Sequence, residues 1–306
     1  MEEALSEIME IPERAEVLAV TGHHRLPLQI PYIGMGSSYF APLAFRFMGV
    51  DIQPEMASEF YSYISRNKIH QSGVILSQSG RSSETLWCTE LFNQYIAVTN
   101  DENSELCKRP NAVSVIPMLA GPESFSSSKT YVNTLLLLFK GFGMDIHPPV
   151  QLLRERFSQY EQKGKFLADE VFSQLSKHKY QGLYIIGSGP NIATALEAAL
   201  ILTESTKLAF QGMPLAQYDH GPKEAAANSI VFFILAKGEN NARALSLIYK
   251  IKKTGAFVLT VEEPESDENF SVLFNIVPFN FMSYYLAKKL NVSDTFLVGG
   301  KVTETE

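Results

Sequence analysis

The chain has 306 residues, a net charge of −7, 45% apolar and 19% charged residues, a globular composition long enough for two domains. The negative charge argues against nucleic-acid binding, and two cysteines are too few for a disulfide framework or a zinc cluster. The acidic N-terminus and the shortness of the apolar runs exclude a signal peptide and a membrane span, so we expect a soluble, cytoplasmic protein.

Strands alternate with helices along the first half of the chain. A helical stretch at 2–21 is interrupted at Pro12, which breaks or restarts the helix. The expected strands are 31–33, 51–56, 74–76, 95–99 and 112–116, and the expected helices are 38–48, one opening at Ser58, 86–92 and 129–142. This alternation predicts a parallel α/β sheet.

A charged, amphipathic segment at 150–162 is expected to be a connecting helix, after which the pattern repeats. The second half is expected to contain strands at 182–186, 230–234, 256–260 and 272–277 and helices at 193–207, 244–253 and 281–290. The repeated order indicates an internal duplication. We therefore predict one domain at 1–149, including the N-terminal helix, and a second at 150–306, including the linker helix and the C-terminal tail.

The turn Ser77-Gln78-Ser79-Gly80-Arg81-Ser82-Ser83 lies between an apolar strand and a helix. Backbone N–H groups, hydroxyls and a helix N-terminus at such a turn favour an anion that binds and leaves, such as a phosphate. The alternative is ordinary N-capping by Ser82 or Ser83. The second half has no counterpart of this turn, so the first half alone is expected to hold the anion.

Two further polar stretches are candidates for the same ligand site. Gly36-Ser37-Ser38 follows the first strand, and parallel sheets bind ligands beyond the carboxyl ends of their strands. A dinucleotide fingerprint is not supported there, because Tyr39 stands where its third glycine would be. Ser124–Lys129 precedes a helix, and for this stretch ligand contact and capping remain equal alternatives.

The second half carries residues that could move protons. Glu197 and Glu204 are seven apart on one helix face, and apolar neighbours of Glu204 would raise the pKa of its carboxyl and suit a general base; a solvated helix face is the alternative. His220 precedes a Gly-Pro turn and could transfer protons near neutral pH. Gly299-Gly300-Lys301 is either a frayed tail or a hinge that brings a lysine over a site.

Together these residues resemble the tandem sugar-isomerase (SIS) family. The resemblance covers about 34–306 and is strongest to the isomerase half of glucosamine-6-phosphate synthase and to stand-alone glucosamine-6-phosphate deaminases. It rests on the turn at 34–38, the Ser77 turn, Ser127 with Lys129, the stretch 195–200, His220-Gly221-Pro222, and the positions of Glu204 and Lys301. It implies two tandem domains, each a three-layer αβα sandwich of flavodoxin-like type around a parallel sheet.

The resemblance also implies residue roles. Gly36, Ser37, Ser38, Ser77, Gln78, Ser79, Ser82 and Ser127 would bind a sugar phosphate. Glu204 would move the proton between C1 and C2, His220 would assist ring opening from a neighbouring subunit of a homodimer, and Lys301 would cover the site or contact a sugar oxygen. No metal or cofactor is required. Departures at Arg81, Ile201, Gln211, Gln217 and Asp219 leave the exact substrate open.

The chain starts at the isomerase unit, without the N-terminal cysteine nucleophile that glutamine-dependent synthesis requires. We therefore expect deamination of glucosamine 6-phosphate to fructose 6-phosphate and ammonia. Deglycation of a fructosamine or fructoselysine 6-phosphate and non-catalytic sensing of a sugar phosphate are the alternatives.

Overall fold

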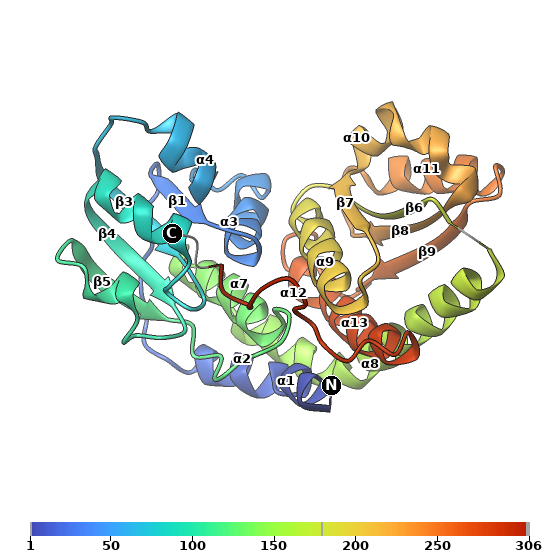
Figure 1. Cartoon of the computed structure of the whole chain (residues 1–306), viewed down its shortest axis with the longest axis horizontal. Coiled ribbons are helices and arrows are strands. Elements are labelled where there is room, and N and C mark those ends of the chain that lie inside the picture. The colour runs from blue at the N-terminus through green and yellow to red at the C-terminus, as the bar shows by residue number, and fades with distance from the viewer. Residues whose placement is uncertain (1, 179, 304–306) are drawn as a thin grey trace. The chain divides into compact units, whose positions relative to one another are not determined.

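A computed structural model describes residues 2–178 and 180–303 (Figure 1). Its contacts cluster into two compact units, each built around one parallel sheet. We call Glu10–Val150 with the tail from Phe296 onward the five-stranded unit, and Gln151–Thr295 with the residues up to Met9 the four-stranded unit. The predicted α/β class with parallel sheets is confirmed.

The five-stranded unit has the sheet order β2-β1-β3-β4-β5, which is the flavodoxin-like order of doubly wound proteins. Its strands are β1 (Pro31–Gly34), β2 (Gln53–Met56), β3 (His70–Leu76), β4 (Phe92–Thr99) and β5 (Ala112–Pro117). Its helices are α2 (Ile11–Ala19), α3 (Ser37–Phe47), α4 (Ala57–Glu59), η1 (Phe60–Ile64), α5 (Ser83–Cys88), η2 (Thr89–Leu91), α6 (Glu105–Lys108) and α7 (Lys129–Gly141).

Both faces of this sheet are buried. Successive side chains of a strand point to opposite faces, so Tyr32 and Ile33 of β1 enter different layers. Tyr32 lies against Phe142, just beyond α7, and the Phe45 ring of α3 is 4.6 Å from that of Phe139 in α7. Ile33 packs instead in a cluster with residues of α4, η1, α5 and α6. This arrangement gives the three layers expected of each sandwich.

The four-stranded unit has the sheet order β7-β6-β8-β9, which repeats the first four positions of the other sheet. Its strands are β6 (Gly182–Gly187), β7 (Phe210–Pro214), β8 (Ser229–Leu235) and β9 (Phe257–Glu262). Its helices are α1 (Glu2–Met9), α8 (His147–Lys177), α9 (Asn191–Thr206), α10 (Leu215–His220), η3 (Pro222–Asn228), α11 (Asn241–Lys252), α12 (Ser271–Asn275) and α13 (Val277–Lys289). The bounds of α8 begin in the five-stranded unit.

β8 is buried along its whole length and supplies both layers of this unit. Val231, Phe233 and Leu235 pack against residues of α10, η3 and α11. Phe232 points the other way, and its ring lies 5.9 Å from that of Phe279 in α13. A strand buried on both faces is apolar without alternation, as the sequence pattern here indicated.

Two expectations for the second half were wrong or incomplete. The segment 272–277 is not a strand, because α12 and the start of α13 occupy it. A short apolar run that is buried all round has the same pattern in a strand and in a helix, and only packing distinguishes them. The edge strand β7 was not expected, since Gly212 and Pro214 weaken the strand signal of this segment.

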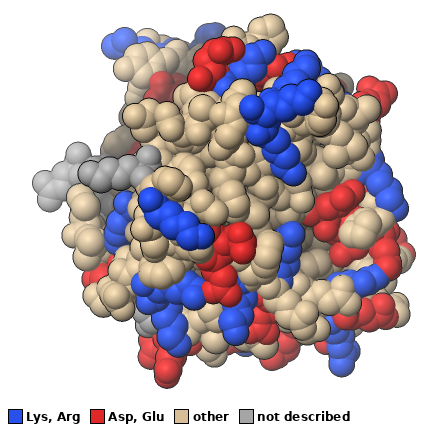
Figure 2. All heavy atoms as spheres, turned by 90° about the vertical axis from the view of Figure 1, so that its right-hand side faces the viewer, with Lys and Arg blue, Asp and Glu red and all other residues tan. Residues whose placement is uncertain are grey.

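The proposed division between residues 149 and 150 stays a prediction. In the structure α1 packs on α13 of the four-stranded unit, while Lys301 of the tail contacts Glu123 of the five-stranded unit. Across the described residues, no helix combines the length and apolar character of a membrane span. On the face drawn in Figure 2, basic side chains are interspersed with acidic ones, as on an ordinary solvated surface.

Candidate functional site

The turn at Ser77 keeps its conformation through bonds made within the turn and to its neighbours. Ser77 is buried, and its Oγ accepts a hydrogen bond of 3.1 Å from the N–H of Gly80. Gly80 has φ +63°, and a Cβ atom there would stand 2.0 Å from Oγ of Ser104. Only glycine therefore fits this position, and the turn is held against the segment that follows β4.

The capping alternative accounts for little of this turn. Ser82 occupies the N-cap position of α5, but its side chain makes no capping hydrogen bond. The helix begins at Ser83, earlier than expected, and has six residues before η2 continues it. Such a short helix has a weak dipole, so side chains and loop N–H groups must supply most of any affinity for an anion.

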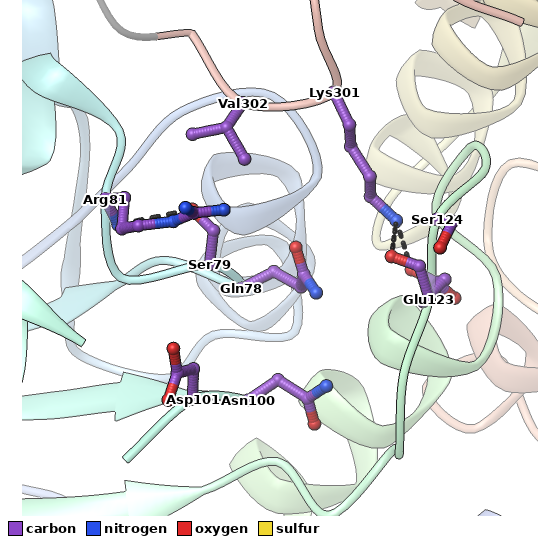
Figure 3. Close-up of a pocket in the computed structure, with 9 residues that line it drawn as sticks. All are labelled: Gln78, Ser79, Arg81, Asn100, Asp101, Glu123, Ser124, Lys301 and Val302. Carbon is purple, nitrogen blue, oxygen red and sulfur yellow. Dashed lines mark hydrogen bonds and ion pairs between the residues drawn. The ribbon is translucent and has the colours of Figure 1, made fainter. Parts of the chain in front are cut away.

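A cavity of about 270 Å³ opens beside the turn. It is lined by Gln78, Ser79, Arg81, Asn100, Asp101, Glu123, Ser124, Lys301 and Val302 (Figure 3). The first three follow β3, the next two follow β4, Glu123 and Ser124 come after β5, and the last two belong to the tail. The cavity thus lies at the carboxyl ends of neighbouring parallel strands, where such sheets bind ligands.

The cavity combines neutral donors with charges of both signs. Gln78, Ser79 and Asn100 offer amide and hydroxyl groups, and Figure 3 shows Arg81 and Lys301 on opposite sides of them. Guanidinium and ammonium groups with several neutral donors suit a ligand with an oxyanion such as phosphate. The carboxylate of Asp101 suits a ligand that also has hydroxyl or amino groups, whereas both carboxylate oxygens of Glu123 already accept hydrogen bonds within the protein.

The Glu123 side chain is tightly held, with 0% of it exposed. Its Oε1 accepts hydrogen bonds from the N–H of Ser128 at 3.0 Å, from the Ser128 hydroxyl at 2.9 Å and from the N–H of Thr130 at 3.2 Å. Its Oε2 accepts from the Thr130 hydroxyl and from Lys301, whose Nζ is 3.0 Å away. The carboxylate therefore caps α7 and pairs with the tail.

The structure brings only some of the predicted residues to this cavity. Gln78, Ser79 and Lys301 line it, whereas Ser77 is buried within its own turn. Gly36, Ser37 and Ser38 lie at the start of α3, after the strand that neighbours β3. The Ser127 hydroxyl lies 3.1 Å from that of Thr130, and Ser82 begins α5. Their roles in binding stay predictions.

Among the lining residues, five were not proposed as ligand contacts, namely Arg81, Asn100, Asp101, Glu123 and Val302. Arg81 was noted only as a departure from the family pattern. Asn100 and Asp101 follow directly on β4, and this position at the end of a parallel strand was the available signal. Glu123 had a weaker signal, an acid shortly before a helix N-terminus.

The predicted proton-transfer residues belong to the four-stranded unit. Glu204 is half-buried near the end of α9. Glu197, seven residues earlier in the same helix, is fully buried. Lys207 donates to the Glu204 carbonyl at 2.6 Å and to the Thr295 carbonyl at 2.5 Å, which fixes the end of the helix. His220 is the exposed last residue of α10.

Asp219 holds the segment that carries His220. Its Oδ1 lies 2.9 Å from Nζ of Lys223 in η3, and its Oδ2 lies 3.1 Å from a guanidinium nitrogen of Arg243 in α11. Hydrogen bonds and attraction from these two cations lower the pKa of Asp219. One carboxylate thus joins three consecutive helical segments around His220.

Comparison with known proteins identifies the fold as one found in phosphosugar-processing enzymes. A solved C-terminal domain of glucosamine-fructose-6-phosphate aminotransferase from Francisella tularensis matches with a TM-score of 0.76 at 19% identity, over 95% of this chain and 97% of that one. Glucosamine-6-phosphate deaminase from Thermotoga maritima matches with a TM-score of 0.78 at 17% identity, over 96% and 95% of the two chains. No family model matches the sequence.

In sequence, the chain is similar to a particular curated enzyme, the isomerizing glutamine–fructose-6-phosphate aminotransferase of Methanothermobacter thermautotrophicus. The two are 26% identical over 305 residues, which is 90% of this chain and 51% of that protein. The chain spans about half the length of the curated relatives that it matches.

Proposed function

We propose that the chain is a phosphosugar isomerase that deaminates an amino sugar 6-phosphate, with glucosamine 6-phosphate as the substrate. The observation that carries this proposal is the cavity at the ends of β3, β4 and β5, where Gln78, Ser79 and Arg81 offer donors for a phosphate. Its support from relatives is the sequence similarity to an isomerizing aminotransferase and the fold shared with a glucosamine-6-phosphate deaminase.

The reaction needs a phosphate anchor and a base. The base takes the proton from C2 of the open-chain sugar and returns it to C1, while a second proton passes from the amino nitrogen to the C1 oxygen. These transfers convert the 2-amino aldose into the C2 imine of fructose 6-phosphate. Water then adds to the imine carbon, and ammonia leaves with fructose 6-phosphate as the product. We assign the proton transfer to Glu204, ring opening to His220 and contact with the sugar to Lys301, because carboxylate, imidazole and ammonium groups suit these steps.

The deciding experiment measures ammonia and fructose 6-phosphate released from glucosamine 6-phosphate. Glu204→Gln should abolish turnover while binding of the sugar phosphate persists, since the phosphate anchor is untouched. Glu161→Gln is the matched control, because Glu161 is also half-buried but accepts from the Tyr285 hydroxyl at 2.6 Å in a surface contact. No release by the wild-type protein at high enzyme concentration would contradict the proposal.

The same assay separates the alternatives. Release of lysine from fructoselysine 6-phosphate, without ammonia from glucosamine 6-phosphate, would indicate a deglycase. Binding of sugar phosphates by a wild-type protein that turns over none of them would indicate a sensor.

We also propose a homodimer in which His220 serves the site of the partner. The exposed position of His220 at the end of α10 supports this. Mixing inactive Glu204→Gln and His220→Gln proteins should then restore part of the activity, since a mixed dimer has one intact site. A fully active monomer in sedimentation at the assay concentration would contradict the dimer.

A further inference from the structure

The C-terminal tail lies against the five-stranded unit with two of its large apolar side chains exposed. Leu297 is 68% exposed and Val298 is fully exposed, and Gly299 and Gly300 are exposed as well. Ordering such a segment costs about 1–2 kcal/mol of backbone entropy per residue. Polar contacts must therefore provide much of what holds the tail.

Two such contacts come from the last described residues. Nζ of Lys301 donates to Oε2 of Glu123 at 3.0 Å and to the Glu123 carbonyl at 2.9 Å. The Thr303 carbonyl accepts from the N–H of Ser83 at 3.1 Å, at the start of α5. The first contact places Lys301 in the wall of the cavity, as Figure 3 shows. The second is made at the last residue of the Ser77 turn.

The Glu123 carboxylate is a fixed point in this arrangement. Ser128 and Thr130 donate to it through both their N–H groups and their hydroxyls, so the start of α7 sets its position. Buried charges that accept several hydrogen bonds have little freedom to move. Lys301 follows two exposed glycines, and within the described part of the chain both hydrogen bonds of its ammonium go to Glu123.

We propose that Glu123 is the positioning residue for Lys301, so that the start of α7 determines where the lysine ammonium stands in the cavity. The catalytic part of this inference rests on the proposed function. Glu123 itself touches no substrate in this scheme and acts through the lysine.

The substitution that tests this is Glu123→Gln. The amide oxygen of glutamine can still accept from Ser128 and Thr130, but its NH2 group faces the ammonium in place of Oε2. We expect turnover to fall by at least about tenfold with a smaller change in KM, because a displaced group loses its alignment while the phosphate anchor remains. Lys301→Met should have the same effect, and the double variant should be no worse than Lys301→Met alone.

The matched control is Glu263→Gln. Glu263 is also a buried carboxylate, which accepts from the Tyr160 hydroxyl at 2.7 Å and the N–H of Glu265 at 2.9 Å in the four-stranded unit. The turnover of the Glu263→Gln variant should equal that of the wild type. Multiplicative losses in the Glu123–Lys301 double variant would overturn the positioning role.

Amide hydrogen exchange in residues 296–303 tests the link without any activity. Both Glu123→Gln and Lys301→Met should speed exchange there relative to the wild type and to Glu263→Gln. Lys301→Met changes a residue of the tail and leaves the hydrophobic core intact. Exchange in this variant therefore tests the link between Glu123 and Lys301 even if Glu123→Gln fails to fold. A tail that stays protected in Lys301→Met overturns the inference even if the enzyme is active, and a missing wild-type activity overturns only the proposed function.

Discussion

Lys129, at the start of α7, donates a hydrogen bond of 2.7 Å to the carboxylate of Glu10, directly before α2. The lysine side chain is 1% exposed and the glutamate side chain 31% exposed. Lys129 ends the stretch for which ligand contact and capping were equal alternatives, and in the structure its charge joins two helices of the five-stranded unit.

The Glu10–Lys129 pair should contribute measurably to stability. Glu10→Gln leaves a buried ammonium without its counter-charge, so we expect the free energy of unfolding to fall by roughly 1–3 kcal/mol in denaturant titrations. Glu13→Gln, in the first turn of the helix that Glu10 precedes, is the control, because the Glu13 side chain is 68% exposed and stands 4.0 Å from that of Arg14. Its effect should stay within about 0.5 kcal/mol, and equal effects of the two changes would contradict the prediction.

The same pair should make stability depend on pH. The hydrogen bond from Lys129 and the charges of Lys129 and Arg14 lower the pKa of Glu10 in the folded protein. A lowered pKa means that the contribution is complete above the usual carboxyl pKa and is lost as the pH falls through the folded value. Asp219, whose pKa is also lowered, acts in the same direction. Unfolding titrations between neutral and acidic pH should therefore show a steeper loss in the wild type than in Glu10→Gln.

Gly80→Ala should disrupt the Ser77 turn through a steric clash. A Cβ there would meet Ser104, and the positive φ adds strain, so we expect a loss of at least about 2 kcal/mol and weaker phosphosugar binding. Gly49→Ala provides the control, since Gly49 has φ +89° with nothing within 4 Å of the added Cβ. It should cost only about 1 kcal/mol and leave binding unchanged. Calorimetry on both variants measures stability and binding.

The two cysteines should differ in reactivity. Cys88 is buried with its thiol against the Ala57 carbonyl, and burial raises its pKa to about 12, so little thiolate forms. Cys107 is half-buried near the protein surface. Alkylation of the native protein at pH 8, followed by mass spectrometry, should label Cys107 first and Cys88 only on unfolding. Equal labelling rates in the native state would contradict this.

Much of the architecture follows from local patterns in the sequence. The alternation of apolar strands with helices predicted parallel α/β sheets, and the polar turn after β3 was recognised because turn residues and strand ends have local signals. The prediction of a strand at 272–277 was wrong, because a helical apolar run that is buried against α9 and β9 has the same sequence pattern as a buried strand. The edge strand β7 was not predicted, because its glycine and proline weaken the sequence pattern of a strand.

What the sequence alone determined was therefore the fold class, the repeat and the polar turn at Ser77. Only the tertiary structure decided which side chains surround the cavity, because Asn100, Glu123 and Lys301 are far apart in the chain and meet through strand order and the course of the tail. It also decided that Lys129 pairs with Glu10, and that Glu123 caps α7 while holding Lys301. Pairings across more than a hundred residues leave no local signal, since they depend on burial and on which charge is left to compensate.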